Sequence, residues 1–394
     1  MYFGVFRFLL ALCVVAQHLQ NLPPANLKAA LEPLEIGSNA VLAFFMLSGY
    51  IITSAYYRFY YNRPVNFIIN RLLRVYPTYI IALFLFIAIT YAIYPSIDIV
   101  IPDTGTSYFS GMTPENIVSN IFLLIPFYDR LPFVAVSVPF IGIAWAVRVE
   151  MLFYIFFFAA ALFCSLSGRS LRRILAILFP VFVALFLYQY VTTRTTQLQF
   201  IPYFAFGIAA FFAEQNHLAR MRGMPGSLGQ FFGSFGSPLL AMSICLVLIV
   251  MHQLGRPSHH EVGFARDFGL QLAIILSFIG AFLVLLWVSI TDRISSAATK
   301  RTDKALGDLS YPLYLNHIIW ILVLDRIVQH SLGATFFAVA VAIGYSAIVS
   351  RLSEPFFVAL RDRIRGQSLG LRDPVPSSGA MTTKAHYSPS PGPS

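Results

Sequence analysis

The chain has 394 residues, a formal net charge of +10, a hydrophobic fraction of 58% and a charged fraction of only 11%. Soluble domains contain roughly 25% charged residues, and here the apolar residues recur along the chain in runs of membrane-spanning length. This composition excludes an ordinary soluble enzyme, a disulfide scaffold and a collagen-like protein. It predicts an all-α polytopic membrane bundle.

Ten apolar runs match the roughly 20 helical residues that cross a hydrocarbon core of ~30 Å. In chain order they cover 5–22, 37–57, 75–95, 141–164, 173–191, 198–214, 237–253, 268–289, 309–328 and 333–354. A further helix is expected over 116–127. It is too short to span and lies inside the long loop 96–140.

The basic residues predict the orientation of these spans. With an even number of spans, both termini lie on the same side of the membrane. The loops and the C-terminal segment on that side carry 18 of the 27 Lys and Arg residues, and the loops on the other side carry 5. By the positive-inside rule the N- and C-termini are cytoplasmic, so the basic excess reports topology and predicts no nucleic-acid partner. We expect a transmembrane domain over 1–360 and a disordered cytoplasmic tail over 361–394, which is rich in Pro, Ser and Gly from residue 366 onward.

The first span carries two ionisable residues, Arg7 and His18. Such groups cost roughly 2.5–3.5 kcal/mol at the centre of a membrane helix, so each one suggests a function. Eleven residues bring the two side chains to the same helix face, about 16 Å apart along the axis. We interpret this face as the wall of a polar cavity. The alternative is an arginine that reaches the interface and a histidine that bonds a neighbouring helix.

Two arginines, Arg71 and Arg74, stand at i and i+3 directly before the run 75–95. Paired guanidiniums suit bidentate contacts to phosphate, although plain anchoring on the positive side explains them more simply. In the fourth span, Glu150 lies about 13 Å below the outer surface by helical rise, near the depth of His18. A carboxylate there needs a cation or a histidine as its partner.

These residues belong to a set of motifs that resembles the acyltransferase-3 family of integral membrane O-acyltransferases. The motifs are Arg7 and His18 as a basic-x10-His pair, FFMLSGYI at 44–51 with Ser48, RLLRVYP at 71–77, Trp145 and Glu150 as W-x4-E, LSYPLYLNH at 309–317 with Tyr311 and His317, and Glu354-Pro355. They occur in the family's order over about residues 1–357.

The resemblance implies a multi-pass protein of the bacterial inner membrane. It would transfer an acyl group, usually acetyl, from cytoplasmic acetyl-CoA to a hydroxyl of an exported or cell-surface glycan or glycolipid. On this reading Arg7, Arg71 and Arg74 hold the donor phosphates, His18 is the general base, and Glu150 orients it. Substrate-binding roles are expected for Ser48, Trp145, Arg148, Tyr311 and His317.

The expected mechanism needs a continuous polar passage from the cytoplasmic arginines to His18, because the donor phosphates cannot enter the bilayer core. No metal is expected, since the three cysteines lie in apolar runs without metal-ligand spacing. The alternative function is a proton-coupled transporter or exporter that uses His18, Glu150 and Arg7 as a proton relay. The acyl group, the acceptor and the oligomeric state stay open.

Overall fold

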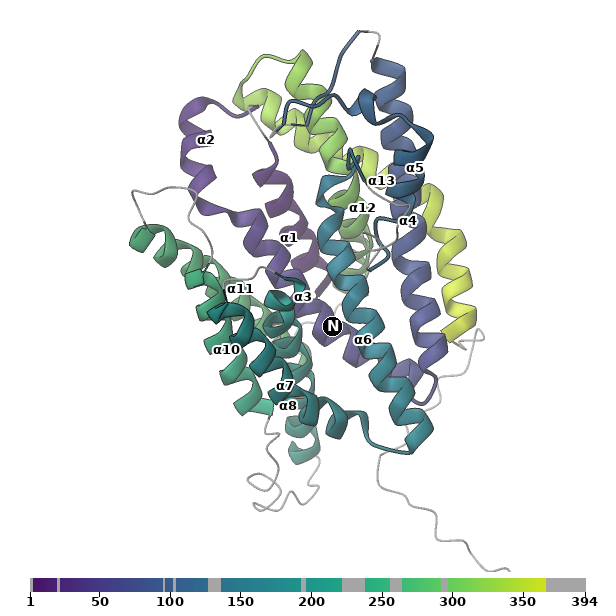
Figure 1. Ribbon diagram of the computed structural model, residues 1–394, viewed down its shortest axis with the longest axis vertical. Coiled ribbons are helices and arrows are strands. Elements are labelled where there is room, and N and C mark those ends of the chain that lie inside the picture. Colours follow the sequence, from purple (N-terminus) through teal and green to yellow (C-terminus); the bar gives the residue numbers. More distant parts are fainter. Residues whose placement is uncertain are drawn as a thin grey trace, which may run out of the picture.

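A computed structural model describes residues 3–19, 22–94, 96–101, 104–126, 136–192, 196–221, 238–255, 264–291 and 297–365. These residues form an all-helical bundle (Figure 1), and the β-structure among them is limited to one isolated bridge between Val100 and Ser107. The predicted fold class is therefore confirmed.

The long helices follow one another up and down the bundle (Figure 1). Their bounds are α1 Phe3–Gln17, α3 Ile36–Ala55, α4 Pro64–Ile93, α6 Trp145–Ser167, α7 Leu171–Val191, α8 Ile201–Met221, α10 Pro238–Gly255, α11 Phe264–Thr291, α12 Ala297–Ile327 and α13 Leu332–Arg365. Shorter pieces are α2 Ala25–Leu31, η1 Glu32–Leu34, η2 Tyr56–Tyr60, η3 Tyr108–Gly111, α5 Pro114–Ile121, η5 Gly142–Ala144 and η6 Gln197–Phe200.

Each of the ten predicted runs falls on one of the long helices. Within the described ranges, seven helical segments are long and apolar enough to cross a membrane; they cover Ala25–Tyr60, Pro64–Ile93, Gly142–Ser167, Leu171–Val191, Pro238–Gly255, Phe268–Thr291 and Leu332–Leu352. The other predicted spans correspond to α1, α8 and α12. With 15 residues, α1 is only about 22 Å long. The number of ten spans and the side of the termini stay predictions.

Several helices extend beyond the predicted runs. The α4 helix begins at Pro64, a proline at its first position, rather than at residue 75, so Arg71 and Arg74 lie inside the helix and not before it. The α13 helix continues to Arg365, which makes the first five residues of the predicted tail helical. The rest of that tail, 366–394, lies outside the described residues. The predicted helix at 116–127 is the shorter α5.

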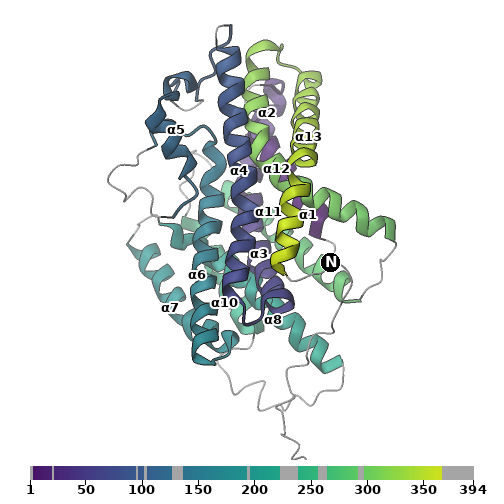
Figure 2. The ribbon, with the colours of Figure 1, turned by 90° about the vertical axis from the view of Figure 1, so that its right-hand side faces the viewer.

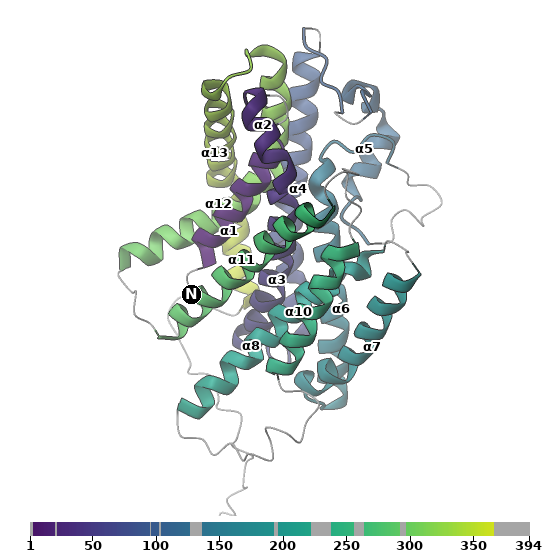
Figure 3. The ribbon, with the colours of Figure 1, turned by 90° about the vertical axis from the view of Figure 1, so that its left-hand side faces the viewer.

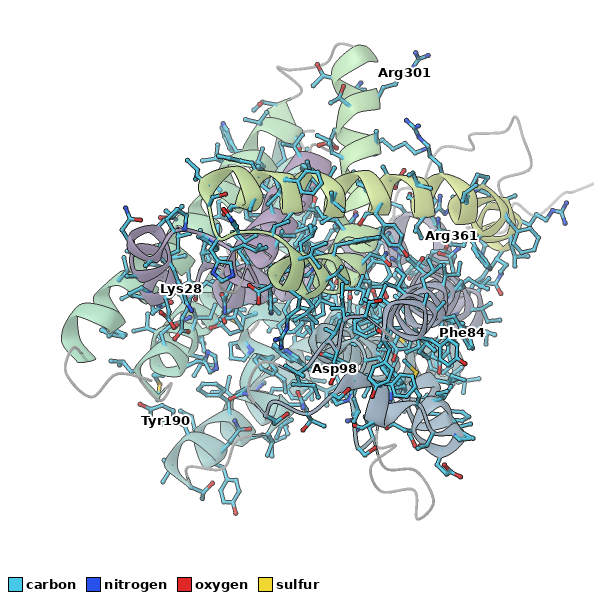
Figure 4. All side chains as sticks on the ribbon, turned by 90° about the horizontal axis from the view of Figure 1, so that it is seen from above. Lys28, Phe84, Asp98, Tyr190, Arg301 and Arg361 are labelled. Carbon is cyan, nitrogen blue, oxygen red and sulfur yellow. The ribbon has the colours of Figure 1, made fainter. Side chains whose placement is uncertain are left out.

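The first turns of α12 leave the bundle sideways (Figures 2 and 3). They carry the exposed Lys300, Arg301 and Lys304, and Arg301 points away from the other helices in the view from above (Figure 4). Pro312 interrupts the backbone hydrogen bonds farther along the same helix. Because α12 begins with these charged residues, only its later part appears in the sequence as an apolar run, at 309–328.

Close contacts fix the helices that surround the centre of the bundle. A Cβ on Gly4 would lie 1.7 Å from the backbone oxygen of Asp303, so α1 and α12 touch there. The Asp303 carboxylate accepts hydrogen bonds from the Gly4 and Val5 amides, at 2.8 and 3.0 Å, and thereby caps α1. Likewise, Gly49 of α3 and Gly207 of α8 bring these two backbones into direct contact.

Candidate active site

A cavity lies at the centre of the bundle between α1, α3, α4, α6 and α12. Its volume of about 90 Å³ is enough for several water molecules. The polar residues in its wall are Arg7, Ser48, Arg71, Arg74, Glu150, Tyr154, Ser310, Tyr311 and Tyr314. Six of the ten predicted site residues, from five separate motifs, thus meet in one place: Arg7, Ser48, Arg71, Arg74, Glu150 and Tyr311.

Three arginines face this cavity. Arg7 comes from α1, whereas Arg71 and Arg74 follow one another on α4, as their spacing predicted. Arg71 is only 4% exposed, its guanidinium lies 5.5 Å from the centre of the Phe67 ring, and its Nε–H has no hydrogen-bond partner. Against these three cations the cavity wall holds one carboxylate, that of Glu150. The excess positive charge suits an anionic ligand.

The Glu150 carboxylate faces the same space from α6. Its Oε1 accepts two hydrogen bonds of 2.6 Å each, one from the Ser48 hydroxyl of α3 and one from the Tyr154 hydroxyl one turn farther along α6. From α12, the Tyr311 hydroxyl donates to the backbone oxygen of Val75 in α4 at 3.1 Å. The carboxylate therefore holds a serine hydroxyl in the cavity that the arginines make cationic.

The two histidines form a separate pair. The rings of His18, directly after α1, and His317, in α12, have centroids 5.3 Å apart. Each Nδ1 lies against a backbone carbonyl, Val14 at 2.8 Å and Leu313 at 3.0 Å. A carbonyl oxygen only accepts, so each Nδ1 carries a hydrogen and the neutral ring keeps its lone pair on Nε2. The buried Nε2 of His317 has no partner.

The imidazole pair lies beyond the lining of the cavity. Phe44 and Tyr314 line the cavity with their rings 6.4 Å apart, and the Tyr314 ring lies a further 6.4 Å from that of His317. Among the described residues, the lining of the cavity that holds the arginines therefore includes neither His18 nor His317, and Tyr314 adjoins both the cavity and His317. The expected contact between Glu150 and His18 is likewise not found, because Glu150 pairs with Ser48 and Tyr154.

The sequence matches a known protein family over most of its length. A family model described as an acyltransferase domain, that of acyltransferase family 3, matches residues 2–351. The chain belongs to the acyltransferase-3 family. It is an enzyme that transfers acyl groups other than aminoacyl groups, and it is a multi-pass membrane protein. No curated protein and no solved structure matches the chain.

Besides the two histidines, two further predicted site residues of this acyltransferase lie away from the cavity wall. Trp145, at the start of α6, is 44% exposed and packs its ring on Phe200 and Phe45, with centroids 5.6 and 6.3 Å away. Arg148, half-buried on the same helix, is not part of the cavity lining. Two residues separate Arg148 from Glu150, so their side chains point to different sides of α6.

The cavity lining also contains Phe44, Tyr154, Ser310 and Tyr314, which the sequence analysis did not assign to a site. Three of them had a usable signal. Tyr154 follows Glu150 at i+4 on one helix, the spacing at which side chains meet, and Ser310 and Tyr314 lie inside the motif LSYPLYLNH that supplied Tyr311 and His317. Phe44 begins the motif FFMLSGYI, but nothing in the sequence distinguishes it from an ordinary core aromatic residue.

Proposed function

We propose that this acyltransferase transfers an acyl group, most simply acetyl, from cytoplasmic acyl-CoA to a hydroxyl group of an exported or cell-surface glycan or glycolipid, in the bacterial inner membrane. The observation that carries the proposal is the central cavity. Three arginines meet there with a carboxylate that holds a serine hydroxyl, so an anion-binding site lies beside a group able to accept a proton.

The three arginines explain how the acyl donor would bind. Acyl-CoA bears phosphate groups on one end and an uncharged pantetheine arm on the other. Charge-assisted hydrogen bonds from Arg7, Arg71 and Arg74 to these phosphates are the kind that Arg provides best. The unpartnered Nε of the buried Arg71 supports this role, because a buried donor without a partner costs free energy that a bound anion would recover. The pantetheine arm can then extend into the apolar part of the bundle.

The imidazole pair explains how the acceptor hydroxyl would be activated. We assign His18 as the general base that takes the proton from the acceptor hydroxyl through Nε2, the nitrogen that its Val14 contact leaves unprotonated. His18 is partly exposed, whereas His317 is fully buried, so the hydroxyl would reach His18 first. His317 lies against the His18 ring and would stabilise the charge that forms there. Ser48 and Tyr311 would contact the donor side.

A thiol-release assay tests this function. Purified protein in lipid nanodiscs, with no ion gradient, is given acetyl-CoA, and the free thiol of CoA is measured over time. The proposal predicts release above that of empty nanodiscs, and faster release when a glycolipid extract from the producing cell envelope is added. The glycans of a deletion strain should lack the mass of an acetyl group. No release with or without extract would contradict the proposed function.

The transporter alternative makes the opposite prediction in the same assay. A proton relay needs a gradient and leaves acetyl-CoA intact. The family assignment favours the acyltransferase, and the three arginines around a carboxylate resemble an anion-binding site more than a proton pathway.

A further inference from the structure

The central cavity, where the acyl donor would bind, and the imidazole pair, where the acceptor would react, are separate places in the bundle. This separation is a problem for direct acyl transfer. If the donor phosphates stay on the arginines, the thioester must pass Phe44 and Tyr314 before an acceptor activated by His18 can attack it. These two aromatic side chains line the cavity and pack edge to face, with ring centroids 6.4 Å apart. A transfer in two stages would need only the small acyl group, rather than the whole pantetheine arm, to be available at this boundary.

Ser48 stands on the donor side of this boundary. It follows Phe44 by one helical turn, about 6 Å along the axis, and both line the cavity. Its hydroxyl donates to Glu150 Oε1 at 2.6 Å. Serine and threonine side chains inside helices often bond instead to a carbonyl in the preceding turn. Thr53, one and a half turns farther along α3, does so with Gly49 at 2.8 Å.

A hydroxyl that donates to a carboxylate is the arrangement of a nucleophile and its base. The Tyr154 hydroxyl holds the same carboxylate oxygen at 2.6 Å and fixes its direction. The site therefore contains a nucleophile and its base within one cavity.

We propose that Ser48 is acylated during the reaction and carries the acyl group as an oxygen ester, with Glu150 as its general base. This inference rests on the proposed function. In the first stage, Glu150 takes the Ser48 proton, the Ser48 oxygen bonds to the acyl carbon, and the carbon–sulfur bond breaks. The thiolate takes the proton from Glu150 and leaves as CoA.

In the second stage, the acceptor hydroxyl gives its proton to His18, and its oxygen bonds to the acyl carbon. The bond between that carbon and the Ser48 oxygen breaks, and the serine oxygen takes the proton that His18 holds, so that Ser48 is again a hydroxyl and His18 is again neutral. Atoms and charges balance without any further reactant. An oxygen ester also withstands water better than an acyl-imidazole would, so the acyl group survives until an acceptor arrives.

The experiment uses the full-length protein in nanodiscs with acetyl-CoA labelled in its acetyl group, and no acceptor. After acid quenching and digestion, we expect the label on the peptide that contains Ser48. In a second sample, labelled free CoA should exchange into unlabelled acetyl-CoA, because the first stage is reversible. Ser48→Ala should abolish both label and exchange while it still binds CoA. Ser48→Cys should carry the label as a thioester, which neutral hydroxylamine removes.

Ser54→Ala is the matched control, because Ser54 is a buried serine on the same helix outside the cavity lining. It should keep both label and exchange. The proposal is wrong if wild-type protein transfers acetyl groups without exchange, if the label lies on His18, or if Ser48→Ala still transfers at the wild-type rate. Wild-type protein that neither binds CoA nor releases its thiol would instead contradict the proposed function itself.

Discussion

The role of Arg71 leads to a prediction in which CoA binding weakens while the stability of the ligand-free protein does not fall. Arg71→Met removes the guanidinium but keeps an unbranched apolar side chain against Phe67. A hydrogen bond to a charged group contributes about 1.5–3 kcal/mol. Its loss therefore weakens the binding of CoA by roughly 10- to 150-fold, at about 1.4 kcal/mol for each factor of ten.

The stability of the empty protein should not fall. Arg71 is 4% exposed and its Nε–H lacks a partner, so the folded protein bears a desolvation cost that the methionine removes. We expect the thermal unfolding midpoint of the variant without ligand to equal or exceed that of the wild type. The rise in midpoint that CoA causes in the wild type should be lost.

Isothermal titration of CoA into protein in nanodiscs gives the affinity, and a thermal unfolding scan of the same samples gives the midpoint. Arg351→Met is the matched control, because Arg351 is exposed on α13 and away from the cavity. Arg71→Lys, which keeps the charge but not the planar fork, should lie between wild type and Arg71→Met. Unchanged CoA affinity in Arg71→Met would refute the reasoning, as would a large loss of stability with no specific effect on CoA.

Three further predictions concern the scaffold and the base. In a thermal unfolding assay, Gly49→Ala should destabilise the protein by about 1–3 kcal/mol through overpacking, because the new Cβ would lie 2.1 Å from the backbone oxygen of Phe204. The control is Gly344→Ala, whose new Cβ would have no atom within 4 Å and which should leave the stability unchanged or raise it. Asp303→Ala should cost about 0.5–2 kcal/mol by removing the cap of α1, and an unchanged unfolding midpoint would show that the cap contributes nothing. His18→Ala should stop acyl transfer to the glycan acceptor without weakening the binding of CoA, and transfer at the wild-type rate would exclude His18 as the base.

The helical architecture could be predicted well from the sequence, because each apolar run is long and needs only its own residues to form a helix. The ends of the helices were less accurate. The apolar run 75–95 predicts a helix that begins after Arg71 and Arg74, yet α4 starts at Pro64. Charged residues interrupt an apolar run but do not end a helix, and arginine is a good helix former. The same reasoning explains the early start of α12 at Ala297.

The residues of the site were predicted better than their contacts. Sequence motifs identified Arg7, Ser48, Arg71, Arg74 and Glu150, all of which line the cavity. The partners could not be predicted, because contacts between helices depend on rotation and crossing angle, which a single sequence does not specify. Depth by helical rise suggested that Glu150 would meet His18. Two residues at similar depth can still face different neighbours, and Glu150 faces Ser48 while His18 faces His317.

The central claim is that the cavity between α1, α3, α4, α6 and α12 binds acyl-CoA with its phosphates on the arginines and its acyl end beside Ser48. An electron cryomicroscopy structure with a thioether analogue of acetyl-CoA, whose carbon–sulfur bond cannot be cleaved by transfer, tests it directly. The account predicts density for the phosphates against Arg71 and Arg74, with the acyl end next to Ser48 and Glu150. An analogue bound elsewhere, or with its phosphates away from the arginines, would contradict it.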